Sequence, residues 1–95
     1  MKLTELKAIQ LAELFSALSD TSRVRIISLL IDGEMRVSAL AEALKLTDSA
    51  VSHQLRGLRQ MHLVRARKTG RQVFYRLDDD HVGRLFSLGL DHIQH

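Results

Sequence analysis

Four residues near the C-terminal end of this 95-residue chain have side chains that bind transition metals. They are Asp79, His81, His92 and His95, spaced D-x-H-x10-H-x2-H within the segment LDDDHVGRLFSLGLDHIQH. Three imidazoles and one carboxylate suit tetrahedral Zn(II), with Co(II) or Ni(II) as further candidates. Because protein would fill all four coordination positions, such a site would be regulatory or structural and would leave no position for a reactive water.

A single helix cannot bring these four ligands to one ion. His81 and His92 are eleven residues apart, so their rings share a helical face but lie roughly 16 Å apart along the axis. Zinc–ligand distances are only about 2.0–2.3 Å. Two helices packed antiparallel about a two-fold axis would bring Asp79 and His81 of one copy to His92 and His95 of the other. The spacing therefore predicts a homodimer with two symmetric metal sites on its interface.

Other interpretations of this segment remain open. Asp78 or Asp80 could replace Asp79 as the carboxylate ligand, or the acidic run could only stabilise the start of a helix. His95 could belong to a frayed and solvated tail. The segment could also serve dimerisation alone, or hold a metal that is needed only for folding.

Five segments with apolar residues at helical spacing must position these side chains. They cover residues 4–18, about 20–31, 37–46, about 48–61 and about 80–93. Ser19 or Asp20 is expected to cap the second helix, Ser38 the third and Thr47 the fourth.

Between the last two helices, residues 63–77 alternate with a period of two on both sides of Thr69-Gly70, which predicts a β-hairpin with a basic tip. The third and fourth helices form a helix-turn-helix pattern, and the hairpin that follows them is a wing. The expected fold class is mainly α with a β-hairpin (α+β), a winged helix-turn-helix that forms a homodimer. Residues 1–95 are expected to form one DNA-binding domain with N- and C-terminal dimerisation helices.

Charge is concentrated in the middle of the chain. Residues 47–76 carry seven basic side chains and one acidic side chain, whereas residues 1–46 are neutral and residues 77–95 carry a net charge of −3. A basic block of this kind favours contact with phosphate. The alternative is the solvated basic face of an ordinary small α+β domain.

The fourth predicted helix would read double-stranded DNA in the major groove, where the N-terminal residues of a recognition helix reach base edges. The residues expected there are Asp48, Ser49, Ser52 and His53. Arg56, further along, is expected to contact phosphate, and Lys68 and Arg71 at the wing tip the adjacent backbone or minor groove. Asp48 could instead only stabilise the helix start, and His53 could be an uninvolved exposed histidine.

Several classes of protein are not expected. The chain has no cysteine, which excludes disulfides and thiolate metal sites. No apolar stretch approaches the roughly 20 residues that span a bilayer, and no signal-peptide pattern is present, so we expect a cytoplasmic protein without membrane contact. Ser52 and His53 are adjacent and would point about 100° apart on a helix. Since no catalytic motif occurs either, we expect neither an enzyme nor a small-molecule substrate.

The order of elements and three strings resemble the ArsR/SmtB family of winged-helix metal-sensing repressors. The strings are ALSDTSRVRIISLL (17–30), LAEALKLTDSAVSHQLRGLRQMHLVRARKTGRQVFYRL (40–77) and the D-x-H-x10-H-x2-H tail. Two departures from the family pattern stand out. Where many members carry E-L-C-x-C, this chain reads Glu34-Met35-Arg36-Val37-Ser38, which removes the thiolate site for arsenic, cadmium or lead. Asp48 stands where related zinc sensors often have Gln, which leaves the base preference open.

The resemblance implies a repressor that binds an inverted-repeat operator as a homodimer and leaves it when Zn(II) or Co(II) binds at the interface. In such sensors a metal-bound histidine donates from its second ring nitrogen to a backbone carbonyl near the end of the recognition helix. Carried over, His92 would donate to the carbonyl of His62. The alternative is a winged-helix DNA-binding regulator of the same fold without metal response.

Overall fold

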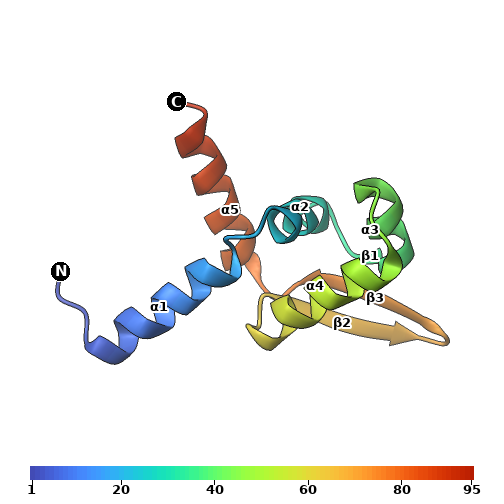
Figure 1. The fold of residues 1–95 in the computed structure, drawn as a ribbon, viewed down its shortest axis with the longest axis horizontal. Helices are drawn as coiled ribbons and strands as arrows, with labels where there is room; N and C mark the ends of the chain where they lie inside the picture. The colour runs from blue at the N-terminus through green and yellow to red at the C-terminus, as the bar shows by residue number, and fades with distance from the viewer.

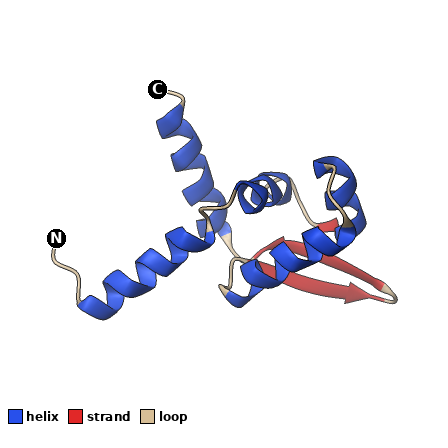
Figure 2. Ribbon diagram, viewed as in Figure 1, coloured by secondary structure: helices blue, strands red, loops and turns tan.

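The structure is a computed structural model that describes residues 1–95, and it contains five helices and three strands (Figure 1). The elements follow in the order α1 (Glu5–Ala17), α2 (Thr21–Leu30), β1 (Met35–Arg36), α3 (Val37–Leu44), α4 (Asp48–Gln60), β2 (Val64–Thr69), β3 (Gln72–Leu77) and α5 (Asp80–Ile93). Helices α3 and α4 form the helix-turn-helix, and β2 and β3 form the wing. The strands lie together at one end of the molecule, while α1 and α5 project from the other (Figure 2). The expected winged helix-turn-helix fold is confirmed.

Side-chain caps determine where most helices begin. The side chains of Thr4, Asp20 and Thr47 each accept a hydrogen bond from the backbone N–H three residues later, at 3.0–3.1 Å. These bonds satisfy donors that have no partner inside the helix. The expected cap at Ser38 is wrong, because β1 runs directly into α3 and the N-cap is Arg36, without a side-chain bond.

The sheet has one more strand than the sequence predicts. The two-residue strand β1 pairs with β3, giving the antiparallel order β1-β3-β2. A strand this short has no alternation to detect. The wing itself has Thr69 opposite Gln72, so Gly70 and Arg71 form its two-residue loop. Gly70 has φ 61°, as the first loop residue of a type II′ hairpin requires.

The core consists of thirteen buried residues, all of them apolar. Most come from α2, α3 and α4, which together hold Ile26, Ile27, Leu30, Leu40, Ala41, Leu44, Val51, Leu55 and Leu58. Helices α1 and α5 contribute only Ala17 and Val82. Helix α4 is thus fixed by the centre of the core, and the two terminal helices are attached at its edge.

The two terminal helical segments keep large apolar side chains exposed in a single copy of the chain. They are Leu3, Leu6, Ile9, Leu11 and Phe15 in and before α1, and Leu88, Leu90 and Ile93 on α5. A cavity of about 320 Å³ lies between α2 and α5, with eight hydrophobic residues among the nine that line it. Extended apolar surface of this kind marks a protein–protein contact. None of the helices is long and apolar enough to span a membrane.

Two residues other than glycine have left-handed backbone conformations. Lys45 (φ 56°) follows α3 and His62 (φ 59°) follows α4. In each turn the next residue donates back into the helix, Leu46 to the carbonyl of Ala41 at 3.0 Å and Leu63 to that of Leu58 at 2.9 Å. These are Schellman motifs, in which glycine is the favoured left-handed residue.

Replacing Lys45 with glycine is therefore expected to raise the free energy of unfolding by about 0.5–1 kcal/mol, because glycine removes the steric cost of the left-handed conformation. Chemical denaturation at fixed protein concentration measures the change. Lys7→Gly, in the exposed face of α1, is the matched control and should lower stability by about 1 kcal/mol. A loss of stability in Lys45→Gly would contradict the expectation.

Candidate metal centre and nucleic-acid interface

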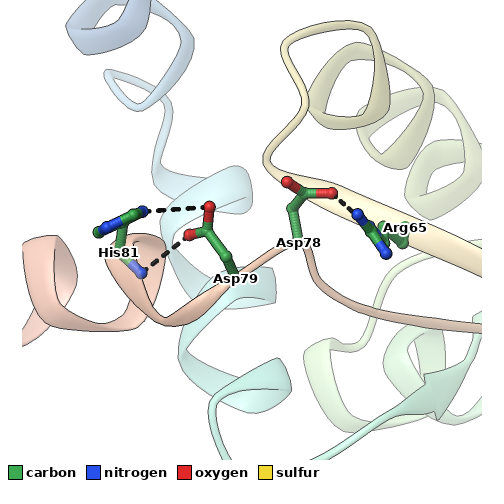
Figure 3. A network of polar contacts seen from close by, with 4 residues as sticks. All are labelled: Arg65, Asp78, Asp79 and His81. Atoms are coloured by element: carbon green, nitrogen blue, oxygen red, sulfur yellow. Dashed lines mark hydrogen bonds and ion pairs between the residues drawn. The ribbon is translucent and has the colours of Figure 1, made fainter.

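Two of the four predicted metal ligands lie side by side at the start of α5 (Figure 3). Asp79 is the N-cap residue, and its Oδ1 accepts a hydrogen bond from the backbone nitrogen of His81 at 2.8 Å. Its Oδ2 lies 3.2 Å from Nδ1 of His81. The hydrogen bond from the His81 side chain, followed by those from the backbone N–H groups of His81 and Val82, lowers the pKa of Asp79. The carboxylate is therefore ionised at neutral pH.

The other two predicted ligands lie at the opposite end of α5. His92 is in the last turn, and His95 follows the C-cap residue Gln94. His95 Nε2 is 3.3 Å from Asp91 Oδ1, whereas the His92 side chain makes no hydrogen bond or ion pair. In a single copy the predicted ligands thus form two separate pairs, and no group of three or more His, Cys, Asp or Glu side chains could hold a metal ion.

The neighbouring aspartates differ in what they bind. Asp78 Oδ1 accepts from Nε of Arg65 at 2.6 Å, which ties the end of the wing to its first strand (Figure 3). Its backbone nitrogen donates to the carbonyl of Leu63 at 3.0 Å. An open groove of about 820 Å³ is lined by Asp78, Asp79 and Asp80 alike. Asp79 makes no contact with the wing, and its side chain is 47% exposed, against 24% for that of Asp78. This geometry favours Asp79 over Asp78 as a ligand that a second chain could reach.

Helix α4 presents one face to the core and the other to solvent. Val51, Leu55 and Leu58 are completely buried. The residues predicted to meet DNA lie away from this stripe: Asp48, Ser49, His53 and Arg56 are exposed and Ser52 is half-buried. Lys68 and Arg71 are exposed near and at the wing tip. The helix and the wing therefore offer a polar, largely basic surface to a common partner.

Two arginines of the basic block are already neutralised within the chain. Arg65 pairs with Asp78, and Arg67 makes a two-pronged ion pair with Glu34. The hydrogen bond from Arg67 lowers the pKa of Glu34, and the Arg67 guanidinium lies 4.8 Å from the centre of the Phe74 ring. Both arginines hold the wing in place. The basic side chains of the block that make no ion pair are Arg56, Arg59, Lys68, Arg71 and Arg76.

The sequence of this chain is similar to those of known regulatory proteins. Residues 20–66 match the family model described as bacterial regulatory protein, arsR family. The chain is 51% identical over 88 residues to a transcriptional repressor SmtB homolog of Synechocystis sp., covering 93% of this chain and 67% of that protein. It is 42% identical over 88 residues to the HTH-type transcriptional regulator NmtR of Mycobacterium tuberculosis, covering 93% of this chain and 73% of that protein.

Solved structures of related proteins have a similar fold. The solution structure of apo-NmtR superposes with a TM-score of 0.85 at 40% identity, covering 100% of this chain and 80% of that chain. A homodimeric winged helix-turn-helix DNA-binding domain from Mycobacterium bovis gives a TM-score of 0.86 at 32% identity, covering 99% of this chain and 90% of that one.

The fold and these matches together define a winged helix-turn-helix regulator of transcription that binds DNA. Within that class, the chain belongs to the ArsR/SmtB family of metalloregulators.

Proposed function

We propose that this chain is a repressor that binds an inverted-repeat operator as a homodimer and releases it when Zn(II) or Co(II) binds at the dimer interface. Each ion is held by Asp79 and His81 of one copy and by His92 and His95 of the other. The observation that carries the proposal is the division of the four ligands into two pairs at opposite ends of α5. An antiparallel partner helix supplies to each pair the ligands that it lacks.

The exposed apolar surfaces support dimerisation through α1 and α5. In a single copy Leu6 is 62% exposed, Leu88 69% and Ile93 76%. Burying such side chains is favourable by about 25 cal/mol for each Å² of apolar area. A homodimer has been described for the M. bovis relative. The groove beside Asp79 leaves room for the end of a partner's α5.

The donor set favours zinc or cobalt. Imidazole is a ligand for Zn(II), Co(II) and Ni(II), and a carboxylate completes a tetrahedral site for the first two. The chain contains no cysteine, so it has no thiolate for softer metals. One relative is named as a cadmium resistance regulatory protein from Staphylococcus aureus. We assign this chain to a different metal because of its ligands.

DNA binding and metal binding are joined through the end of α4. We assign Asp48, Ser49, Ser52 and His53 to the major groove, and Arg56, Lys68 and Arg71 to the phosphate backbone or minor groove. The carbonyl of His62 accepts no hydrogen bond in the single chain. Metallation of one His92 nitrogen makes the other a strong donor, which in the loaded dimer bonds to this carbonyl. That bond favours a dimer whose recognition helices no longer fit successive major grooves.

The experiment that tests the proposed function measures DNA affinity with and without zinc. The probe is a duplex that the metal-free wild-type protein selects from a randomised pool. Zinc is expected to weaken binding by at least about tenfold, which is a coupling free energy of about 1.4 kcal/mol. Because coupling is reciprocal, DNA should weaken zinc binding by the same factor. Unchanged DNA affinity would favour the second candidate, a winged-helix regulator of this fold without metal response.

Replacing His62 with glycine distinguishes a role of its backbone carbonyl from a role of its imidazole. His62→Gly keeps the carbonyl and suits the left-handed φ of 59°, so the response to zinc should persist within about twofold of the wild type. The ratio of DNA affinities with and without zinc measures this response. Loss of the response would show that the imidazole of His62 acts, and that the proposed backbone route is wrong.

A further inference from the structure

The side chain of Arg23 on α2 connects three helices, because it also contacts α1 and α4. Its Nε donates to Oε1 of Gln54 on α4 at 2.8 Å, and its Nη1 donates to the carbonyl of Ala17 at the end of α1 at 3.1 Å. Arg23 itself lies in the first turn of α2, where its backbone nitrogen donates to Asp20 at 3.1 Å. It makes no ion pair, and the two side-chain hydrogen bonds that it does make go to neutral acceptors on two other helices.

A glycine on α4 provides the space for this guanidinium. A Cβ at Gly57 would lie 3.0 Å from Nη2 and 3.5 Å from Cζ of Arg23. Glycine in a helix interior is otherwise unfavourable compared with alanine. Gln54 and Gly57 are three residues apart and so lie on one side of α4. Together they form a seat in which one residue accepts a hydrogen bond and the other removes a steric obstacle.

The seat lies on the flank of α4, between its buried stripe and its exposed face. At 100° per residue, Gln54 is about 60° from Val51 and Gly57 about 120° on the same side. Gly57 is also one turn from His53, which belongs to the exposed face. The buried residues Val51, Leu55 and Leu58 hold the helix against the core, and a contact on the flank restrains its rotation about its own axis. That rotation decides which side chains reach the bases.

The second acceptor of the Arg23 guanidinium is the carbonyl of Ala17, the only buried residue of α1. Ala17 is 6% exposed, whereas the rest of that helix lies at the surface and projects from the body (Figure 1). The carbonyl of Ala17 belongs to the last turn, where helix carbonyls lack partners within the helix and attract positive charge. Arg23 therefore fixes the recognition helix relative to the end of α1.

We infer that Arg23, seated on Gln54 and Gly57, is a positioning residue for DNA recognition that holds α4 in register with α1. It acts through α4 and not by reading bases. The side chains of a binding site must be held within about 0.5 Å of their productive positions to keep its affinity. In a dimer both recognition helices must fit the DNA at once, so a mispositioned α4 weakens binding at both half-sites. Positioning by Arg23 affects the DNA affinity of the metal-free protein, so its test does not depend on the proposed zinc site.

Gly57→Ala is the sharpest test, because it separates positioning from stability. The added methyl group requires Nη2 of Arg23 to shift by a few tenths of an ångström, which strains the two hydrogen bonds of the guanidinium, while alanine favours the helix. The variant is expected to stay folded and dimeric, with a melting temperature within about 4 °C of the wild type or above it. Its metal-free affinity for the selected duplex is expected to fall by at least about tenfold.

Arg23→Lys provides the second variant, since a lysine ammonium is a compact charge that cannot hold the same two acceptors with a planar fork. It should weaken DNA binding to a similar extent. Arg25→Lys is the matched control: Arg25 lies on the same helix, is exposed, and its side chain makes no hydrogen bond or ion pair. It should bind DNA like the wild type.

The double variant Arg23→Lys/Gly57→Ala completes a thermodynamic cycle. If both changes act through one seat, the double variant should bind DNA within about twofold of the weaker single variant. Circular dichroism gives the melting temperature, sedimentation the dimer and fluorescence anisotropy the affinity. Wild-type DNA affinity in Gly57→Ala and Arg23→Lys, additive losses in the double variant, or a loss fully accounted for by unfolded or monomeric protein would each overturn the inference.

Discussion

Replacing His92 with alanine is expected to remove the effect of zinc on DNA affinity. The wild-type protein should bind its selected duplex at least about tenfold more weakly with zinc, whereas the two affinities of His92→Ala should agree within about twofold. The substitution removes a metal ligand and also the donor proposed for the His62 carbonyl. The DNA affinity of the metal-free protein should not change, because His92 lies in the last turn of α5 and its side chain makes no hydrogen bond or ion pair. Fluorescence anisotropy with and without zinc measures both quantities.

Gln94→Ala is the matched control for this variant. Gln94 is also exposed, follows His92 closely, and takes part in the end of α5 only through its backbone. It should respond to zinc like the wild type. A His92→Ala protein that still leaves DNA when zinc is added would refute the role of this histidine, and a Gln94→Ala protein without response would mean that the whole helix end had been disturbed.

Zinc affinity should fall steeply in mild acid. Metal ligands must be deprotonated, so protons compete with zinc for the nitrogens of the three histidines and the zinc affinity falls as the pH falls. Between about pH 7.5 and about pH 5.5 the zinc affinity of the metal-free protein is expected to fall by more than about hundredfold. Isothermal titration calorimetry in several buffers measures the affinity and the protons released.

The carboxylate should take no part in this pH dependence. The pKa of Asp79 lies below its ordinary value of 3.8, chiefly because of the hydrogen bond from His81, so Asp79 is ionised throughout that range. The stability that ionised Asp79 adds to the folded state is present above its ordinary pKa of 3.8 and is lost only as the pH falls through the lowered pKa. Circular dichroism at about pH 5.5 checks that the dimer is still folded. A zinc affinity that changes by less than about tenfold would argue against a site built from three histidines.

Most of the fold follows from local patterns in the sequence. The spacing of apolar residues predicts all five helices, and the cap residues Asp20 and Thr47 mark two of their starts. The change to a period of two, with Thr69-Gly70 in the middle, predicts the wing. These signals are local because side-chain periodicity and capping act over a few residues.

What the sequence does not predict depends on contacts between distant residues. Strand β1 exists because Met35 and Arg36 meet Tyr75 and Phe74, and two residues alone carry no strand pattern. Arg67 belongs to the basic block of residues 47–76, and its pairing with Glu34, thirty-three positions away, cannot be read from the sequence. The contact of Arg23 with Gln54 cannot be predicted either, because the two residues are far apart in the sequence. The one sequence signal is Gly57, since a glycine inside a helix indicates a close neighbour.

The candidate metal site, too, is only partly predictable from the sequence. The sequence supplies the four ligand types and their spacing, and the structure shows Asp79 beside His81 and His95 beside Asp91. The step that joins the two ends of α5 in one coordination sphere requires a second copy of the chain. It therefore rests on the geometry of a dimer.

Mixing two complementary variants tests that step most directly. One variant carries Asp79→Ala and His81→Ala, and the other carries His92→Ala and His95→Ala, so that neither homodimer can complete a site. Unfolding and refolding them together in equal amounts produces mixed dimers with one intact site each. The account predicts that neither variant alone binds zinc tightly, and that the mixture recovers about one quarter of the wild-type zinc capacity. No recovery in the mixture, or tight zinc binding by either variant alone, would contradict a site shared between two copies.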